Sequence, residues 1–285
     1  MGAPRDVPSG GDARGRICGG RRCDNLRMRQ LNVRGSTPGM LKTRVMLAGG
    51  RVHVESAPSG QRDVGFLAPA FNHIRELLVS DYGVNDVSAI GSMKRLESIH
   101  IGNPPNPRVG SLPDGSPLRE VIMNWSPSTS VLAALPRLEH LAISNATSEA
   151  VESIRATLSS LILDGPRITG LVRLPSVKDK LIIHKIKHLD LRDLVFACAP
   201  RRLQLEDIGS ISGLQCIPVG VEELILNSIG SAEGSDLHGI PAKLIGIDGT
   251  GLLPELRAWN RADPADLRQR ADLEQAVWDK LASSL

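Results

Sequence analysis

Aromatic residues are scarce in this chain of 285 residues, because three Phe, three Trp and one Tyr make up only 2% of it. Hydrophobic residues as a whole reach 41%, which is ordinary for a soluble globular protein. The core must therefore be built almost wholly from Leu, Ile and Val. Such a core favours a fold of repeated thin layers, in which one aliphatic shape recurs.

The chain also lacks long apolar runs and a complete cysteine motif for metal binding. We expect no membrane span and no secretory hydrophobic region, since neither kind of segment is visible. Cys18 and Cys23 form a C-x4-C pair, but no second pair completes a zinc site. His184 and His188 are four residues apart at the end of an expected strand, so they lack the helical geometry of a metal pair. We predict neither metal nor cofactor.

Motifs of catalysis are missing as well. The sequence has no G-x-S-x-G, no H-E-x-x-H, no P-loop and no G-x-G-x-x-G. We therefore predict that the protein is not an enzyme and that it has no catalytic residues.

Positive charge is concentrated near the start of the sequence. Residues 1–40 hold eight Arg, no Lys and three Asp, a local charge of +5, so the remainder carries about −2 of the net +3. Their Gly and Pro content predicts a disordered leader. A basic leader also leaves nucleic-acid binding open as an alternative function.

The central part of the sequence is periodic. Segments such as "IRELLVSD", "LEHLAISN" and "VEELILNS" share apolar residues at their first, fourth and sixth positions. Nine such segments follow one another at intervals of 20 to 22 residues, measured between their central apolar residues Leu77, Ile99, Val121, Leu141, Leu161, Leu181, Leu203, Leu224 and Leu244. Alternation within each segment predicts a short strand, and neighbours must stack to bury their apolar faces.

These segments resemble the leucine-rich repeat family, whose signature is L-x-x-L-x-L followed by Asn, and the interval is that of short bacterial repeats. The resemblance covers residues 74–250 and implies an α/β solenoid with a parallel sheet on its concave face. Convex returns of mixed helical and irregular structure would connect its strands. The family's Asn positions fall here on Ser126, Ala146, Ile186 and other residues that are not Asn, so we expect irregular turns.

Both ends of a solenoid need covers. Residues 41–73 contain "TRVMLAGGRVHVES", where two alternating runs flank Gly49 and Gly50, and this pattern predicts an N-terminal hairpin cap. Residues 251–285 contain Asp263 and Pro264 before an apolar stripe, which predicts a C-terminal helical cap.

The fifth position of each segment should project from the concave face. Six of the nine residues there are large aliphatics, which predicts an apolar stripe on the order of 38 Å long. Third positions should form a polar rim, as at a protein interface. The residues expected to contact a partner are Leu78, Glu120, Ile122, His140, Ile162, Lys180, Ile182, Arg202 and Ile225.

We therefore predict non-enzymatic recognition of a protein partner whose identity the sequence does not give. The stripe's other interpretations are coverage by the protein's own termini, and a homodimer in which two stripes face each other. We expect a cytoplasmic protein of bacterial type. The alternative is a secreted bacterial effector or adaptor that lacks a Sec signal peptide.

Overall fold

The computed structural model describes residues 30–35, 39–102, 106–113, 115–232, 240, 242 and 244–248, the last stretch by its backbone only. The expected C-terminal helical cap and most of the expected leader lie outside these residues. The elements are, in chain order, β1 (Leu31–Arg34), α1 (Leu41–Leu47), β2 (Arg51–Ser56), η1 (Gly65–His73), β3 (Glu76–Val79), η2 (Ser88–Ser92), β4 (Ser98–Ile101), β5 (Glu120–Asn124), η3 (Pro127–Thr129), α2 (Ser130–Ala133), β6 (His140–Ser144), α3 (Ser148–Glu152), β7 (Leu158–Asp164), β8 (Val172–Arg173), β9 (Val177–Asp190), η4 (Leu191–Asp193), β10 (Leu194–Val195), β11 (Arg202–Ser212), η5 (Leu214–Cys216), β12 (Glu223–Ala232) and β13 (Leu244–Asp248).

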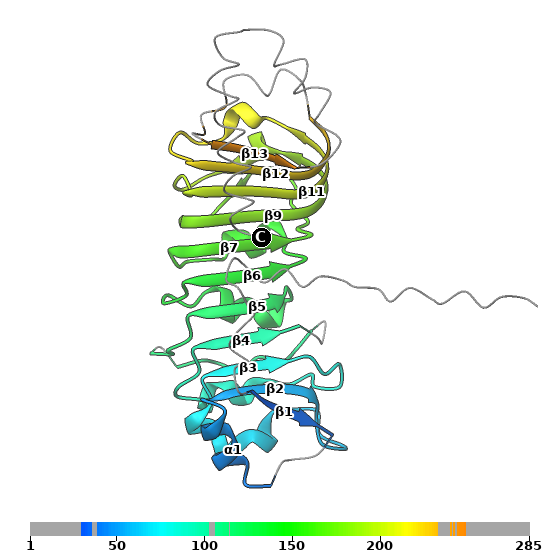
Figure 1. The fold of residues 1–285 in the computed structure, drawn as a ribbon, viewed down its shortest axis with the longest axis vertical. Coiled ribbons are helices and arrows are strands. Elements are labelled where there is room, and N and C mark those ends of the chain that lie inside the picture. Colours follow the sequence, from blue (N-terminus) through cyan, green and yellow to red (C-terminus); the bar gives the residue numbers. More distant parts are fainter. Residues whose placement is uncertain are drawn as a thin grey trace, which may run out of the picture.

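One large parallel sheet dominates the protein. Eleven strands lie in the order β1-β2-β3-β4-β5-β6-β7-β9-β11-β12-β13, and Figure 1 shows them stacked like rungs along the long axis. Strands β8 and β10 form a separate parallel pair. The helices in the described part of the chain are short α or 3₁₀ segments in the connections between strands. The predicted α/β class with a parallel sheet is confirmed at this level.

The central apolar residues of the predicted segments form the buried ladder of the sheet. Val121 pairs with Leu141, and Leu141 with Leu161, and all three are at most 2% exposed. In "PRLEHLAISN", Leu141 and Ile143 are alternate residues of β6 that face the core, while Leu138 enters the core from the preceding turn. Alternate strand residues share a face, so this spacing gives one apolar side to every strand.

The predicted register of the last segment is wrong by one residue. Leu224 pairs with Ile245, not with Leu244, and Ile225 pairs with Gly246. Ile245 therefore does not continue the predicted stripe. A shift of one residue moves every side chain to the opposite face, and "KLIGID" offers apolar residues in both registers.

The predicted N-terminal hairpin is wrong. Residues 41–47 form helix α1, and β2 pairs in parallel with β1 and β3. Leu41, Val45 and Ala48 recur at helical spacing and are buried. Gly49 and Gly50 have φ values of 65° and 84°, and the Gly50 N–H donates to the Val45 carbonyl. Left-handed glycines closing such a bond end a helix as readily as they turn a hairpin.

The predicted leader is also too long, since residues 31–34 belong to the sheet. β1 pairs with β2, and its residues Leu31 and Val33 are at most 5% exposed. Two apolar residues in "LNVR" gave too short a pattern to separate this strand from the preceding sequence.

A left-handed bend recurs where five neighbouring strands end or turn. The equivalent residues Asn145, Gly165, Lys185, Asp207 and Ser228 all have φ between 51° and 60°. After the bend, Ile186, Ile208 and Ile229 are buried and paired with one another. They occupy positions where the leucine-rich repeat pattern would place Asn. In β9, β11 and β12 the bend lies inside a longer strand, so pairing continues beyond it.

Candidate functional site

Strand register aligns the predicted contact residues across the sheet. The central row consists of residues that pair successively from β2 to β13, and these are His53, Leu78, His100, Ile122, Ala142, Ile162, Ile182, Gln204, Ile225 and Gly246. These residues alternate with the buried ladder and therefore face away from the core. Leu78 and Ile225 are seven strands apart, so the row between them spans roughly 34 Å.

The aliphatic side chains of the central row are not widely exposed. Leu78, Ile122, Ile162 and Ile225 are half-buried, and Ile182 is only 7% exposed. Ala142 lies between Ile122 and Ile162, and its side chain is smaller than those of both neighbours.

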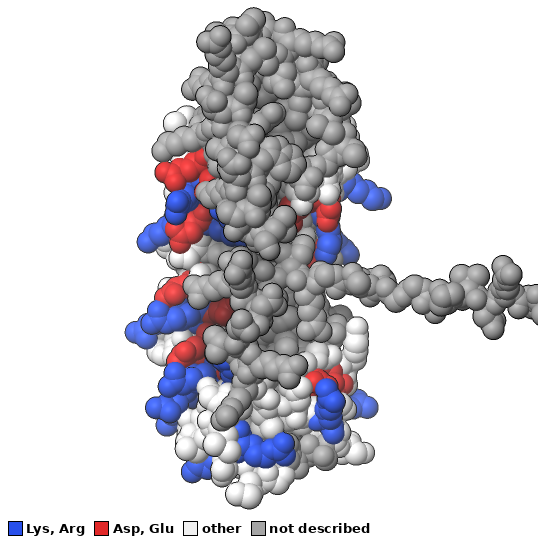
Figure 2. Space-filling model, in the orientation of Figure 1, with Lys and Arg blue, Asp and Glu red and all other residues white. Residues whose placement is uncertain are grey.

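A second set of side chains lies two residues before the central row on each strand, and we call it the amino-side row. Its members from β2 to β12 are Arg51, Glu76, Ser98, Glu120, His140, Ser160, Lys180, Arg202 and Glu223. Figure 2 shows acidic and basic side chains interspersed along the flanks of this view. All four polar residues of the predicted contact set, Glu120, His140, Lys180 and Arg202, belong to this row.

Arg202 is committed to an internal ion pair. Its Nε lies 2.6 Å from Glu223 Oε2, and Glu223 is only 9% exposed. Arg51 bonds Glu76 in the same way across β2 and β3, at 2.9 Å. Arg202 thus holds a neighbouring strand, and it offers a partner less free charge than the sequence suggested.

Lys180 has a different environment. It is half-buried and makes no salt bridge or hydrogen bond within the described part of the chain. Burial lowers the pKa of its ammonium group, the neighbouring Arg202 lowers it further, and Glu206 acts in the opposite direction. A carboxylate brought to this position would offset both unfavourable effects. Glu120 and His140 likewise have no ion pair with another described residue.

His100 lies in the central row between Leu78 and Ile122. Burial lowers the pKa of its imidazole, Glu120 raises it, and His53 contributes a smaller lowering. His100 is not a member of the predicted contact set. The structure makes it the one ionisable member between two aliphatic positions of the row.

Side chains from β1, from β2 and from the residue that follows β3 form a polar network at the β1 end of the central row. His53 Nε2 lies 2.7 Å from Ser80 Oγ, and His53 Nδ1 lies 3.6 Å from Glu55 Oε1. Arg34 holds the same carboxylate at 2.5 and 3.1 Å, and this ion pair lowers the pKa of Glu55. His53 Nδ1 is too far from the Glu55 carboxylate for a hydrogen bond. The bonds of the network join neighbouring strands, and we therefore interpret it as cross-strand support.

Sequence reasoning missed this network because it placed neither β1 nor β2 in the parallel sheet. The signal was nevertheless present. "RVHVES" alternates buried Val52 and Val54 with His53 and Glu55, as each later strand alternates its own residues.

The carboxyl-side row lies two residues beyond the central row, and from β5 to β12 it consists of Asn124, Ser144, Asp164, His184, Glu206 and Asn227. Several of its members are also paired internally. Asp164 Oδ2 accepts from Ser144 Oγ at 3.1 Å, and Asp164 Oδ1 lies 3.0 Å from Lys185 Nζ and 3.6 Å from His184 Nδ1. In the described ranges, no three His, Cys, Asp or Glu side chains are grouped so as to hold a metal ion. No helix among the described residues is long and apolar enough to span a membrane.

Comparison with known proteins does not identify the chain. No protein-family model, curated protein or solved structure matches it.

Proposed function

We propose that this protein is a leucine-rich-repeat-like solenoid that binds a protein partner, without catalysis, through the face carrying the central row. The observation that supports this most strongly is the aliphatic part of that row, which runs in register through Ile122, Ala142, Ile162 and Ile182. Polar rows flank it on both sides, and an apolar centre with a polar rim is typical of protein interfaces.

Charge indicates what such a partner should present. Lys180 and Glu120 border the aliphatic segment and lack ion pairs with described residues. A partner with aliphatic side chains for the centre, a carboxylate for Lys180 and a cation for Glu120 would complement this surface. Arg202 and the carboxyl-side row would contribute shape more than charge, because their own ion pairs occupy them.

Binding should be tested with variants that leave the core untouched. Ile122→Glu/Ile162→Glu changes two half-buried positions, whereas Ile182 is too buried for an informative charge substitution. Leu171→Glu is the matched control, since Leu171 is an aliphatic residue that is 68% exposed outside the sheet. Circular dichroism would establish that all variants fold.

A partner captured by the unmodified full chain would be purified and measured against each variant by calorimetry. We expect the double variant to bind at least about tenfold more weakly, a loss of 1.4 kcal/mol, and Leu171→Glu to bind normally. Lys180→Glu should weaken binding as well. Unchanged affinity in the folded double variant would refute the proposal, and sedimentation of the full chain would show whether the partner is a second copy.

A further inference from the structure

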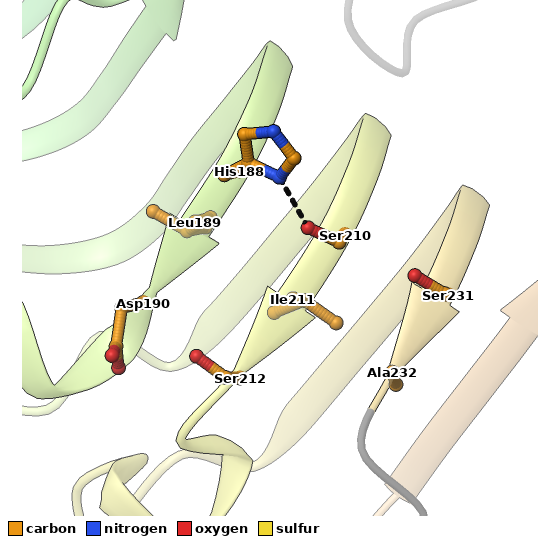
Figure 3. A pocket seen from close by; sticks show the side chains of 8 residues that line it. All are labelled: His188, Leu189, Asp190, Ser210, Ile211, Ser212, Ser231 and Ala232. Atoms are coloured by element: carbon orange, nitrogen blue, oxygen red, sulfur yellow. Dashed lines mark hydrogen bonds between the residues drawn. The ribbon is translucent and has the colours of Figure 1, made fainter.

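A hollow of about 330 Å³ lies on the sheet beyond the left-handed bend, away from the central row. Figure 3 shows that three adjacent strands, β9, β11 and β12, supply its lining. The residues that line it are His188, Leu189, Asp190, Ser210, Ile211, Ser212, Ser231 and Ala232. Its volume is at the lower end of the range for small-molecule sites.

Register gathers hydroxyl groups in this hollow. Ser210 pairs with His188 on one side and Ser231 on the other, and Ser212 pairs with Asp190. Paired residues on neighbouring strands lie about 5 Å apart. The hollow therefore presents three hydroxyls and an imidazole on a small grid.

The polar groups of the hollow retain hydrogen-bonding capacity. His188 Nδ1 lies 2.6 Å from Ser210 Oγ (Figure 3), which leaves Nε2 for another partner. Ser231 Oγ donates to the Gly209 carbonyl at 3.4 Å, and its lone pairs still accept. Hydroxyl groups both donate and accept, so this lining suits a ligand that does the same.

The charge of the hollow is balanced internally. Asp190 accepts from the Arg192 backbone N–H and Nε at 2.9 Å, and its Oδ2 lies 2.7 Å from an Arg192 terminal nitrogen. Arg192 is the main cause that lowers the pKa of Asp190, and Ser212 also bonds this carboxylate. The carboxylate is therefore neutralised and its acceptor sites are occupied. Neither an anion nor a cation would gain a free counter-charge here.

We propose that this hollow binds a neutral polyhydroxylated ligand of about the size of one monosaccharide. The ligand's hydroxyls would contact Ser210, Ser231 and His188 Nε2. This site does not depend on the central row, so it stands or falls independently of protein recognition.

The test uses the full chain and three probes, the methyl α-glycosides of glucose, mannose and galactose. The chain has seven His, and the His188 ring signal can be assigned by comparison with His188→Gln. We expect at least one glycoside to shift that signal saturably. A ligand of about twelve non-hydrogen atoms at ordinary ligand efficiency gives a dissociation constant on the order of 1 mM.

Two variants distinguish a built site from surface effects. Ser210→Val/Ser231→Val removes two hydroxyls from strand positions that tolerate Val, and should weaken binding at least about tenfold. Ser160→Val makes the same change on β7 and should leave binding unaltered. The proposal is overturned if no glycoside gives a saturable shift up to about 50 mM, if inorganic phosphate or acetate binds equally well, or if Ser160→Val weakens binding as much.

Discussion

Gly230→Ala provides the sharpest test of how closely β11 and β12 pair beyond the bend. A Cβ atom at Gly230 would lie 2.5 Å from the Gly209 carbonyl oxygen and 3.3 Å from the Gly209 carbonyl carbon. The same contact occurs one strand earlier, where a Cβ at Gly209 would lie 2.6 Å from the Lys187 carbonyl oxygen. Both obstacles are backbone atoms of a paired strand, so no side-chain rotation relieves the overlap.

Two effects of opposite sign determine the size of this change. Replacing Gly by Ala inside a strand ordinarily stabilises by about 0.5–1 kcal/mol, because the unfolded chain loses freedom. Forcing a methyl group into close-packed surroundings costs about 1–3 kcal/mol. The contact at Gly230 is with backbone, so the cost should prevail. We expect a net loss of roughly 1–2 kcal/mol and a melting temperature lower by about 4 °C.

Thermal unfolding followed by circular dichroism would measure this loss. Gly115→Ala is the matched control, because a Cβ at Gly115 meets no atom within 4 Å and its φ is not positive. That variant should melt at or slightly above the temperature of the unmodified chain. An unchanged or raised melting temperature for Gly230→Ala would refute the close pairing of β11 with β12.

Three further predictions concern the sheet itself. Leu161→Ala should lower the free energy of unfolding by about 2–5 kcal/mol, since the side chain is fully buried; Ile162→Ala, on the opposite face, should cost clearly less, and equal losses in urea unfolding would contradict the assigned faces. The lowered pKa of His100 means that, as pH falls below 6.5, the unfolded chain takes up a proton that the folded chain resists. Stability should therefore fall between pH 6.5 and the folded pKa, and less so in His100→Gln; identical pH profiles of the melting temperature would rule this out. Lys180→Met should raise the free energy of unfolding by roughly 0.5 kcal/mol, because it removes a half-buried cation with no described counter-ion; a less stable variant in urea would show that Lys180 is structurally required.

Much of the sheet could be predicted because its signal is periodic and redundant. A strand buried on one face repeats the same three apolar positions, and eight consecutive segments gave the same register as the structure. An error at one strand would have exposed its whole apolar set. The register of "KLIGID" could not be predicted in this way, because Leu244, Ile245 and Ile247 satisfy two registers almost equally.

The beginning of the sheet could not be predicted for a different reason. Gly49 and Gly50 are compatible with a hairpin and with a helix end, and local sequence does not separate the two. The difference lies in Leu41 and Val45, which recur four residues apart but also fit a short alternating strand. Only the parallel pairing of β2 with β1 and β3 decides between them.

The bend explains why one sheet carries two unlike surfaces. Strands β3 to β6 have four or five residues each and do not extend past the position of the bend. Strands β9, β11 and β12 continue through the bend and have 14, 11 and 10 residues. Non-glycine residues in the left-handed region cost roughly 1 kcal/mol each, and here Lys185, Asp207 and Ser228 adopt it in register. Each is followed by a buried isoleucine, whose burial contributes about 1.5–3 kcal/mol and offsets that cost. Replacing Ile186, Ile208 or Ile229 should therefore disrupt the strand pairing beyond the bend, and the hollow with it. The central row should keep its register.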